Sequence, residues 1–174
     1  MPPPPIVETA TIHAPLDRVF ALSTRIELVQ RTLGMQLVDT GVAGGITSGH
    51  ITANSRVVWR GWKFGLPTAH HTLITAFEAP HTTAAGQTSA FFEDSQEQGR
   101  FRTFRHEHFF TETADETNLE DHIHFTLPFG PFGRIAAKLL LAPHIRKLAR
   151  RRFALIKQLA ESEGWREWIK NHPA

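Results

Sequence analysis

Two stretches near the middle of the chain decide the fold: Phe104-Arg-His-Glu-His-Phe-Phe110 and Thr117-Asn-Leu-Glu-Asp-His-Ile-His-Phe-Thr-Leu127. Each alternates between two sets of side chains, the pattern of a strand with one buried face. The turn-forming pair Ala114-Asp115 separates them, so we expect an antiparallel hairpin. Pro128-Phe-Gly-Pro-Phe-Gly133 follows and ends the sheet.

Side-chain alternation divides the histidines of this hairpin between two faces. Phe104, His106, His108 and Phe110 share one face of the first strand, and Leu119, Asp121, Ile123, Phe125 and Leu127 share one face of the second. Because the apolar members should face the core, His106 and His108 point inward beside Asp121. His122 and His124 then point outward, which argues against a zinc site built from all four. We expect no metal.

The rest of the chain predicts one α+β domain. Residues 6–13 read as a strand, and short helices are expected to begin near Ala14 and to cover 27–33. Between Gly34 and Pro128 we expect strands at about 35–42, 49–59, 60–64 with 68–78, 86–94, 100–112 and 117–127. A helix is expected over 134–163, kinked or interrupted at Pro143. Both the sheet and the helix need an apolar partner, so we predict a seven-stranded curved antiparallel sheet wrapped around the long C-terminal helix, with a cavity between them.

Composition excludes several kinds of chemistry. The 174 residues include 13 Phe and 11 His but no Cys and no Tyr, so disulfides, thiolate metal sites, cysteine nucleophiles and phenolic acids are excluded. A net charge of +2 gives little reason to expect nucleic acid. No run approaches the roughly 20 apolar residues that span a bilayer, and no secretory signal is seen. We expect one cytoplasmic domain over 1–174, with a proline-rich lead-in at 1–5 and a tail at 164–174, and no stable membrane insertion.

The long helix carries a charge on its apolar side. Arg152 falls at the centre of the stripe that includes Leu148, and a buried guanidinium needs a partner or an anionic ligand. Asp121 is the natural partner, with Asp94 or Glu93 as alternatives, and contact with a ligand or a position at the cavity rim stays open. The basic run 146–152 is typical of a solvated face, with contact to anionic lipid or nucleic acid as the alternative.

These motifs resemble those of the START-like, polyketide cyclase/dehydrase-type superfamily (SRPBCC). The matching residues are the two hairpin strands, the Leu-Pro-Phe-Gly-Pro-Phe-Gly segment that ends at Gly133, and the Ala-Pro-x-x-x-Val-Phe start of the first helix. The resemblance implies the helix-grip fold and binding of hydrophobic molecules such as lipids, sterols or polyketides. It implies no catalytic set for this chain. The lack of Tyr separates it from cyclases that use phenol groups.

We therefore expect a domain that binds or carries a hydrophobic, lipid- or polyketide-like small molecule, without a cofactor. The predicted ligand-binding residues are Trp62, Phe64, Phe104, His106, His108, Phe110, Asp121, Ile123, Phe125, Leu148 and Arg152. The alternative is a cyclase or dehydratase with His106 or His108 as general base and Asp121 beside it. A second alternative is an interaction module that docks a partner or an anionic membrane through the basic helix or the Trp165–Trp168 tail. The inward polar groups could also be purely structural.

Overall fold

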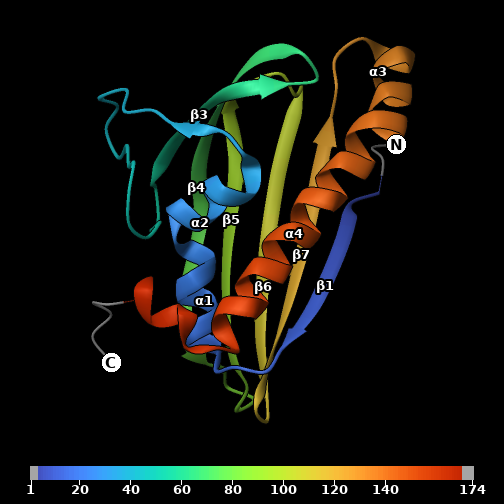
Figure 1. The fold of residues 1–174 in the computed structure, drawn as a ribbon. Coiled ribbons are helices and arrows are strands. Elements are labelled where there is room, and N and C mark those ends of the chain that lie inside the picture. Colours follow the sequence, from blue (N-terminus) through green and yellow to red (C-terminus); the bar gives the residue numbers. More distant parts are fainter. Residues whose placement is uncertain (1–3, 170–174) are drawn as a thin grey trace.

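The strands form one curved antiparallel sheet that wraps around the C-terminal helix (Figure 1). We describe residues 4–169 of a computed structural model; residues 1–3 of the expected lead-in and residues 170–174 of the expected tail lie outside the described residues. The sheet order is β1-β7-β6-β5-β4-β3-β2. The strands are β1 (Ile6–Ile12), β2 (Gln36–Leu37), β3 (Arg56–Lys63), β4 (Leu66–Thr82), β5 (Thr88–Gln98), β6 (Thr103–Thr113) and β7 (Glu116–Thr126). The predicted architecture is confirmed.

Two short helices and one long helical segment cover the inner side of the sheet. The short ones are α1 (Leu16–Thr24) and α2 (Ile26–Leu33), and α2 ends at Gly34, whose φ of 61° closes the helix in the left-handed conformation. The C-terminal segment consists of α3 (Gly130–Ala136), the π-helical turn η1 (Ala137–Leu141), α4 (Ala142–Ala160) and, after a short break, the 3₁₀ turn η2 (Glu163–Glu167). Figure 1 shows α4 lying obliquely across the sheet. Within the described residues, no helix is both long and apolar enough to cross a membrane.

The C-terminal helix begins earlier than predicted and passes Pro143 without a break. It starts at Gly130 rather than Arg134, because Pro131 fits the first turn, where no N–H donor is needed. Pro143 cannot donate to the carbonyl four residues back. The chain accommodates this loss with the π-helical turn η1, in which the N–H of Ala142 donates to the carbonyl of Ala137.

The strand predicted at 49–59 is wrong over its first half. Residues 38–55 form a long connection that holds only isolated bridges, Arg25 with His50 and Gly45 with Arg56. Gly44, Gly49 and Asn54 have φ values of 77°, 87° and 64°, which repeatedly turn the chain out of an extended path.

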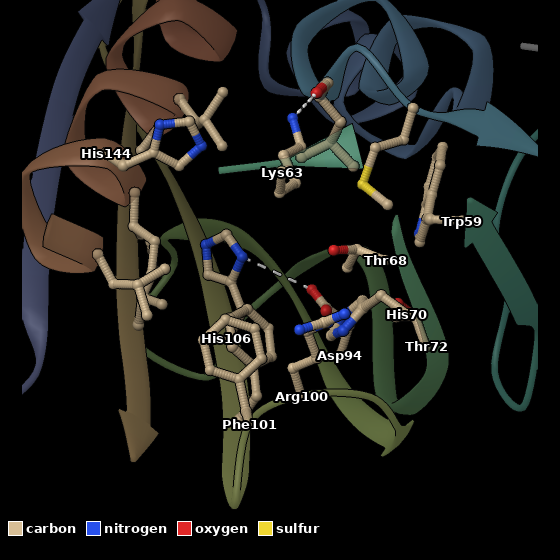
Figure 2. A pocket seen from close by; sticks show the side chains of 18 of the residues that line it. Trp59, Lys63, Thr68, His70, Thr72, Asp94, Arg100, Phe101, His106 and His144 are labelled. Atoms are coloured by element: carbon tan, nitrogen blue, oxygen red, sulfur yellow. Dashed lines mark hydrogen bonds and ion pairs between the residues drawn. The ribbon is translucent and has the colours of Figure 1, made fainter. Parts of the chain in front are cut away.

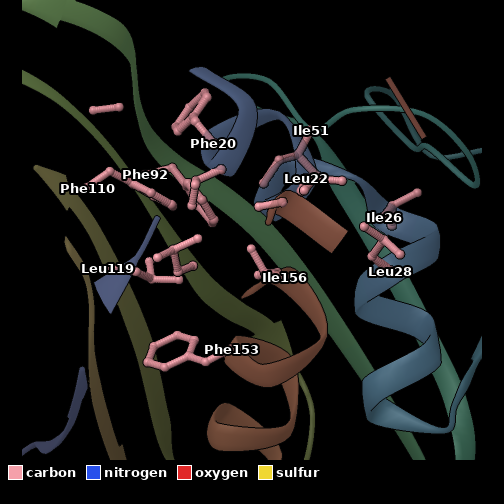
Figure 3. Close-up of a cluster of buried hydrophobic side chains, with 14 of the residues drawn as sticks. Phe20, Leu22, Ile26, Leu28, Ile51, Phe92, Phe110, Leu119, Phe153 and Ile156 are labelled. Carbon is pink, nitrogen blue, oxygen red and sulfur yellow. The ribbon is translucent and has the colours of Figure 1, made fainter. Parts of the chain in front are cut away.

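The main core lies where the first helix meets the sheet and α4. Figure 3 shows Phe20 of α1 facing Phe92 of β5 and Phe110 of β6, with Phe153 and Ile156 arriving from α4. The ring of Phe20 lies edge-on to Phe92 and Phe110, with centroids 6.1 and 5.2 Å apart. These aromatic contacts fill the space beneath α1 and leave a cavity elsewhere between sheet and helix.

The aromatic tail packs back on the same domain. Trp165 and Trp168 contact the main core, and the guanidinium groups of Arg18 and Arg31 lie 4.6 Å from the ring centroids of Trp165 and Trp168 respectively. Cation–π contacts of this kind cover the ring faces. Both tryptophans are only partly buried, and docking of a partner through this tail stays a prediction from the sequence.

Candidate ligand-binding site

A cavity of about 660 Å³ lies between the sheet and the C-terminal helix. This volume falls within the roughly 300–1,000 Å³ usual for small-molecule sites. Its walls are mainly apolar and come from α2, β3 to β7 and the C-terminal helix. They include Ile26, Val29, Met35, Val57, Trp59, Ile74, Phe92, Phe101, Phe104, Ile123, Ile145, Leu148 and Ala149. Such walls favour the burial of an apolar molecule.

A cluster of imidazoles and carboxylates interrupts this apolar wall. In the sheet register, Asp94 of β5 lies opposite His106 of β6, and His108 lies opposite Asp121 of β7. His108 Nδ1 is 2.7 Å from Asp121 Oδ1, and His108 Nε2 is 3.2 Å from Asp94 Oδ2. His106 Nε2 is 3.0 Å from Asp121 Oδ2, at an angle poor for a hydrogen bond. Figure 2 shows a dashed line between His106 and Asp94, whose Nδ1 and Oδ2 atoms are 3.7 Å apart.

Arg152 joins this cluster from the opposite side of the cavity. Its Nη1 donates to Asp121 Oδ2 at 3.2 Å, and its Nη2 donates to the carbonyl of Ser23 at the end of α1 at 3.1 Å. The side chain is buried and also forms part of the cavity wall. The pairing with Asp121 that the sequence favoured is therefore present, and it does not exclude a position on the wall.

The cluster holds two carboxylates in their charged form. Burial alone would raise the pKa of Asp121, but His108, His106 and Arg152 outweigh that effect and hold it well below its usual range. Burial also opposes ionisation of Asp94, yet the hydrogen bond with His108 and the nearby imidazoles lower its pKa. Desolvation lowers the pKa of His106, so this imidazole is neutral at pH 7.

The cavity mouth is formed by the β3–β4 turn and the C-terminal helix. Phe64 has a φ of 52° and is followed by Gly65 with a φ of 72°, as in a tight hairpin turn, and the ring centroid of Phe64 lies 5.0 Å from that of His144. Lys63 donates from Nζ to the carbonyl of Leu33 (Figure 2). Desolvation, with help from Lys63 and Lys147, lowers the pKa of His144.

The structure sorts the predicted ligand-binding residues into two groups. Seven lie on the cavity wall: Phe64, Phe104, His106, His108, Ile123, Leu148 and Arg152. Four lie off it: Trp62, Phe110, Asp121 and Phe125.

Each of the four has a physical reason for its position. Trp62 is 71% exposed on the other face of β3. Phe110 points inward as predicted, but α1 covers it with Phe20. Asp121 is fully buried behind the two histidines, and Phe125 packs in a smaller cluster with Ile6 and Ile123.

Several wall residues were not identified from the sequence. Trp59 and Trp62 have opposite orientations, and alternation alone does not tell which one faces inward. The sequence suggested Asp94 only as a partner of Arg152, because alternation does not tell which face of β5 is buried. Phe92 and Asp94 share one face, and Phe91 and Glu93 share the other. Each face thus has one aromatic ring and one carboxylate. The register of Asp94 against His106 is the signal that identifies it.

No protein-family model and no curated protein matches the chain, but solved structures do. The Zhui aromatase/cyclase from Streptomyces sp. R1128 has a TM-score of 0.62 at 12% identity, covering 97% of this chain and 98% of that one. A START superfamily protein from Mycobacterium smegmatis has a TM-score of 0.61 at 12% identity, covering 90% and 99%. The chain shares the helix-grip fold of these two proteins. A protein from Thermus thermophilus, with a TM-score of 0.61 at 16% identity over 91% and 100% of the two chains, is a further example.

At these identities the likeness establishes the fold alone. The helix-grip fold fixes where a cavity can form, between sheet and helix. The chemistry of the cavity comes from this chain's own side chains, and above all from Asp94, His106, His108 and Arg152.

Proposed function

We propose that the protein binds a small, largely apolar molecule in this cavity and holds a polar end of it beside Arg152 and His106. The observation that carries the proposal is an apolar cavity of about 660 Å³ with one polar cluster on its wall. Burial of the apolar part supplies affinity, and the few polar groups fix orientation. The helix-grip neighbours support this at the level of the fold.

The test is a titration with the fluorescent apolar anion 1-anilinonaphthalene-8-sulfonate. Leu148 lies on the cavity wall, so Leu148→Trp should occupy ligand space and weaken binding by more than about tenfold. The matched control is Leu140→Trp, because Leu140 is 60% exposed and lies off the wall. This variant should bind like the wild type. Absence of binding to the wild type, or equal loss in both variants at unchanged stability, would overturn the proposal.

A series of straight-chain carboxylic acids competing for the same site measures how much chain is buried. Each buried methylene contributes about 0.8 kcal/mol, so Kd should fall about fourfold per added carbon until the cavity is filled. The break in the series then reports the usable length of the cavity. An affinity independent of chain length would contradict an apolar binding mode.

A second candidate function, loading of the ligand at an anionic membrane surface, is favoured by the rim of the cavity. Phe129 and Phe132 are 82% and 80% exposed, although both lie at the cavity. Large exposed apolar side chains of this kind are typical of interaction sites. Leu139 of η1 is also exposed, and Arg134 and Lys138 of the same helical segment supply positive charge. Residues 127–160 contain no acidic side chain. An apolar rim with basic neighbours complements a bilayer that holds anionic phospholipid.

Sedimentation with vesicles tests this candidate. The wild type should bind vesicles of phosphatidylcholine with phosphatidylserine more strongly than phosphatidylcholine alone, and salt should weaken the difference. Phe129→Glu/Phe132→Glu should abolish binding, and Val42→Glu, an exposed apolar residue of the 38–55 connection, should not. Binding that is equal for both vesicle types, or that survives the rim substitutions, would exclude it.

A cyclase or dehydratase reaction stays a prediction from the sequence. The Nδ1 atom of His106 is the candidate base, because His106 lines the cavity and is neutral at pH 7. His106→Ala separates the two functions: an enzyme should lose turnover with ligand affinity retained, whereas a carrier has no turnover to lose.

A further inference from the structure

Three potential metal-ligand atoms converge on the cavity wall. One atom each from Asp94, His106 and His108 lies within 4.8 Å of the others, and all three residues line the cavity. Asp94 Oδ2 is 3.2 Å from His108 Nε2 and 3.7 Å from His106 Nδ1. Ligand atoms around a tetrahedral zinc ion are roughly 3.4 Å apart, since its bonds are about 2.0–2.2 Å long. The two spacings to Asp94 lie within a few tenths of an ångström of this value, and the spacing between the two imidazole nitrogens is at most 4.8 Å.

The opposite ring nitrogens of both imidazoles face a single buried carboxylate. Asp121 has its Oδ1 2.7 Å from His108 Nδ1 and its Oδ2 3.0 Å from His106 Nε2. Arg152 Nη1 also lies 3.0 Å from His108 Nδ1, but this guanidinium has Asp121 as its acceptor. The shorter contact to the carboxylate assigns the Nδ1 proton to the Asp121 bond. A metal ion between His108 Nε2 and Asp94 would replace the Nε2 proton that otherwise bonds Asp94, while Nδ1 stays on Asp121, as in carboxylate–histidine–metal arrangements.

The charges of the cluster leave a place for a cation. Asp94 and Asp121 carry two negative charges, and Arg152 supplies one positive charge in contact with Asp121. The ring nitrogens His106 Nδ1 and His108 Nε2 both face Asp94 Oδ2 inside a mostly apolar wall. A cation held between these three atoms would compensate the buried charge of Asp94.

We infer that Asp94, His106 and His108 form a binding site for a divalent transition-metal ion, with Asp121 as the positioning residue behind both imidazoles. Two imidazoles and one carboxylate suit zinc or iron(II), and three protein ligands leave a coordination position open toward the cavity. The sequence predicted no metal because the four histidines of the hairpin fall on two faces. The structure supplies a different third ligand, Asp94, from a neighbouring strand. This site does not depend on the proposed apolar ligand.

Calorimetric titration of chelator-treated, untagged protein with Zn²⁺ tests the inference. The wild type should bind one ion, and Asp94→Asn and His106→Gln should each weaken binding by more than about tenfold. The matched control, His122→Gln/His124→Gln, removes two imidazoles from the outer face of the same hairpin and should stay within about twofold of the wild type. Absence of stoichiometric binding to the wild type, or an equal loss in the control, would overturn the site.

A second measurement keeps the test valid if an inner variant does not fold. Co²⁺ added to wild-type protein labelled with ¹⁵N-histidine should shift the imidazole signals of His106 and His108 far more than those of His122 and His124. Equal shifts on both faces would contradict the site. Vesicle binding and dye binding are measured in separate experiments. A protein that binds no metal ion can therefore still bind the apolar ligand, and a protein that binds no apolar ligand can still bind the metal ion.

Discussion

The two faces of the β6–β7 hairpin carry the same kinds of side chain in different surroundings. On the inner face, the side chains of His106 and His108 are 16% and 3% exposed and share the fully buried Asp121. On the outer face, His122 and His124 are 29% and 35% exposed. The inner group lies against a cavity, and the outer group lies against water.

The outer histidines have carboxylate partners as well. His122 pairs with Glu120, which is 45% exposed, and His124 Nε2 lies 3.0 Å from Glu107 Oε2. Water screens the His122–Glu120 pair, whereas Glu107 is 17% exposed and also pairs with Arg105. In the inner group each carboxylate must be compensated by protein atoms, because desolvation of an unpaired charge is costly. The comparison teaches that burial, rather than the identity of the pair, makes a histidine–carboxylate contact into a site.

The largest expected difference between the faces is in the effect of removing a carboxylate. Asp121→Ala leaves Arg152 buried beside two imidazoles without its partner, so it should lower the free energy of unfolding by about 3–5 kcal/mol. Glu120→Ala on the outer face, where the carboxylate is 45% exposed, should cost less than about 1 kcal/mol. Urea unfolding followed by circular dichroism measures both. Similar losses for the two variants would show that the faces do not differ.

An intermediate effect is expected in the pH dependence of stability. The unfolded chain protonates His106 near pH 6.5, whereas in the folded state desolvation lowers the pKa of His106 despite Asp121 and Asp94 nearby. The unfolded state therefore binds more protons below about pH 6.5, and stability decreases as pH falls from there by at most about 1.4 kcal/mol per pH unit for this group. His70, whose pKa is also lowered mainly by desolvation, acts in the same direction.

Unfolding midpoints measured between about pH 5 and 8 check this prediction. His106→Gln should reduce the slope of stability against pH and leave only the part of that slope that is due to His70. Asp121 affects stability at lower pH, because its pKa is depressed. The stability it provides is complete above about pH 4 and is lost as pH falls further. Identical slopes above pH 5 for wild type and His106→Gln would refute the burial effect assigned to this residue.

The smallest effect is expected from the outer histidines. His122→Gln/His124→Gln removes two partly exposed pairs and should cost less than about 1 kcal/mol in the free energy of unfolding. The same urea titration measures it, and the result also establishes whether this variant is a sound control for metal binding. A loss as large as that of Asp121→Ala would mean that the outer pairs are structural.

The sequence was sufficient to predict which histidines face inward. Alternation in β6 and β7 is strict, and apart from Phe109 the apolar residues of each strand share one face, so His106, His108 and Asp121 could be assigned without a structure. The same rule failed to identify Asp94, because β5 presents an aromatic ring and a carboxylate on each face. Only the pairing of strands far apart along the chain brings Asp94 opposite His106.

Packing decided the remaining positions. Phe110 has the predicted orientation but lies under Phe20, since α1 covers that part of the sheet. Phe64 reaches the cavity mouth through a turn with positive φ, which a phenylalanine rarely adopts and which strand alternation does not predict. Local pattern therefore specified the direction of side chains, and helix placement specified which of them line the cavity.

The most direct test of the central claim, that the inner face of this hairpin lines a ligand-binding cavity, is a titration of ¹⁵N-histidine-labelled protein with 1-anilinonaphthalene-8-sulfonate, followed through the imidazole signals. The account predicts that the signals of His106 and His108 move with the bound fraction and that those of His122 and His124 stay in place. Signals that stay fixed on the inner face, or that move equally on both faces, would contradict it.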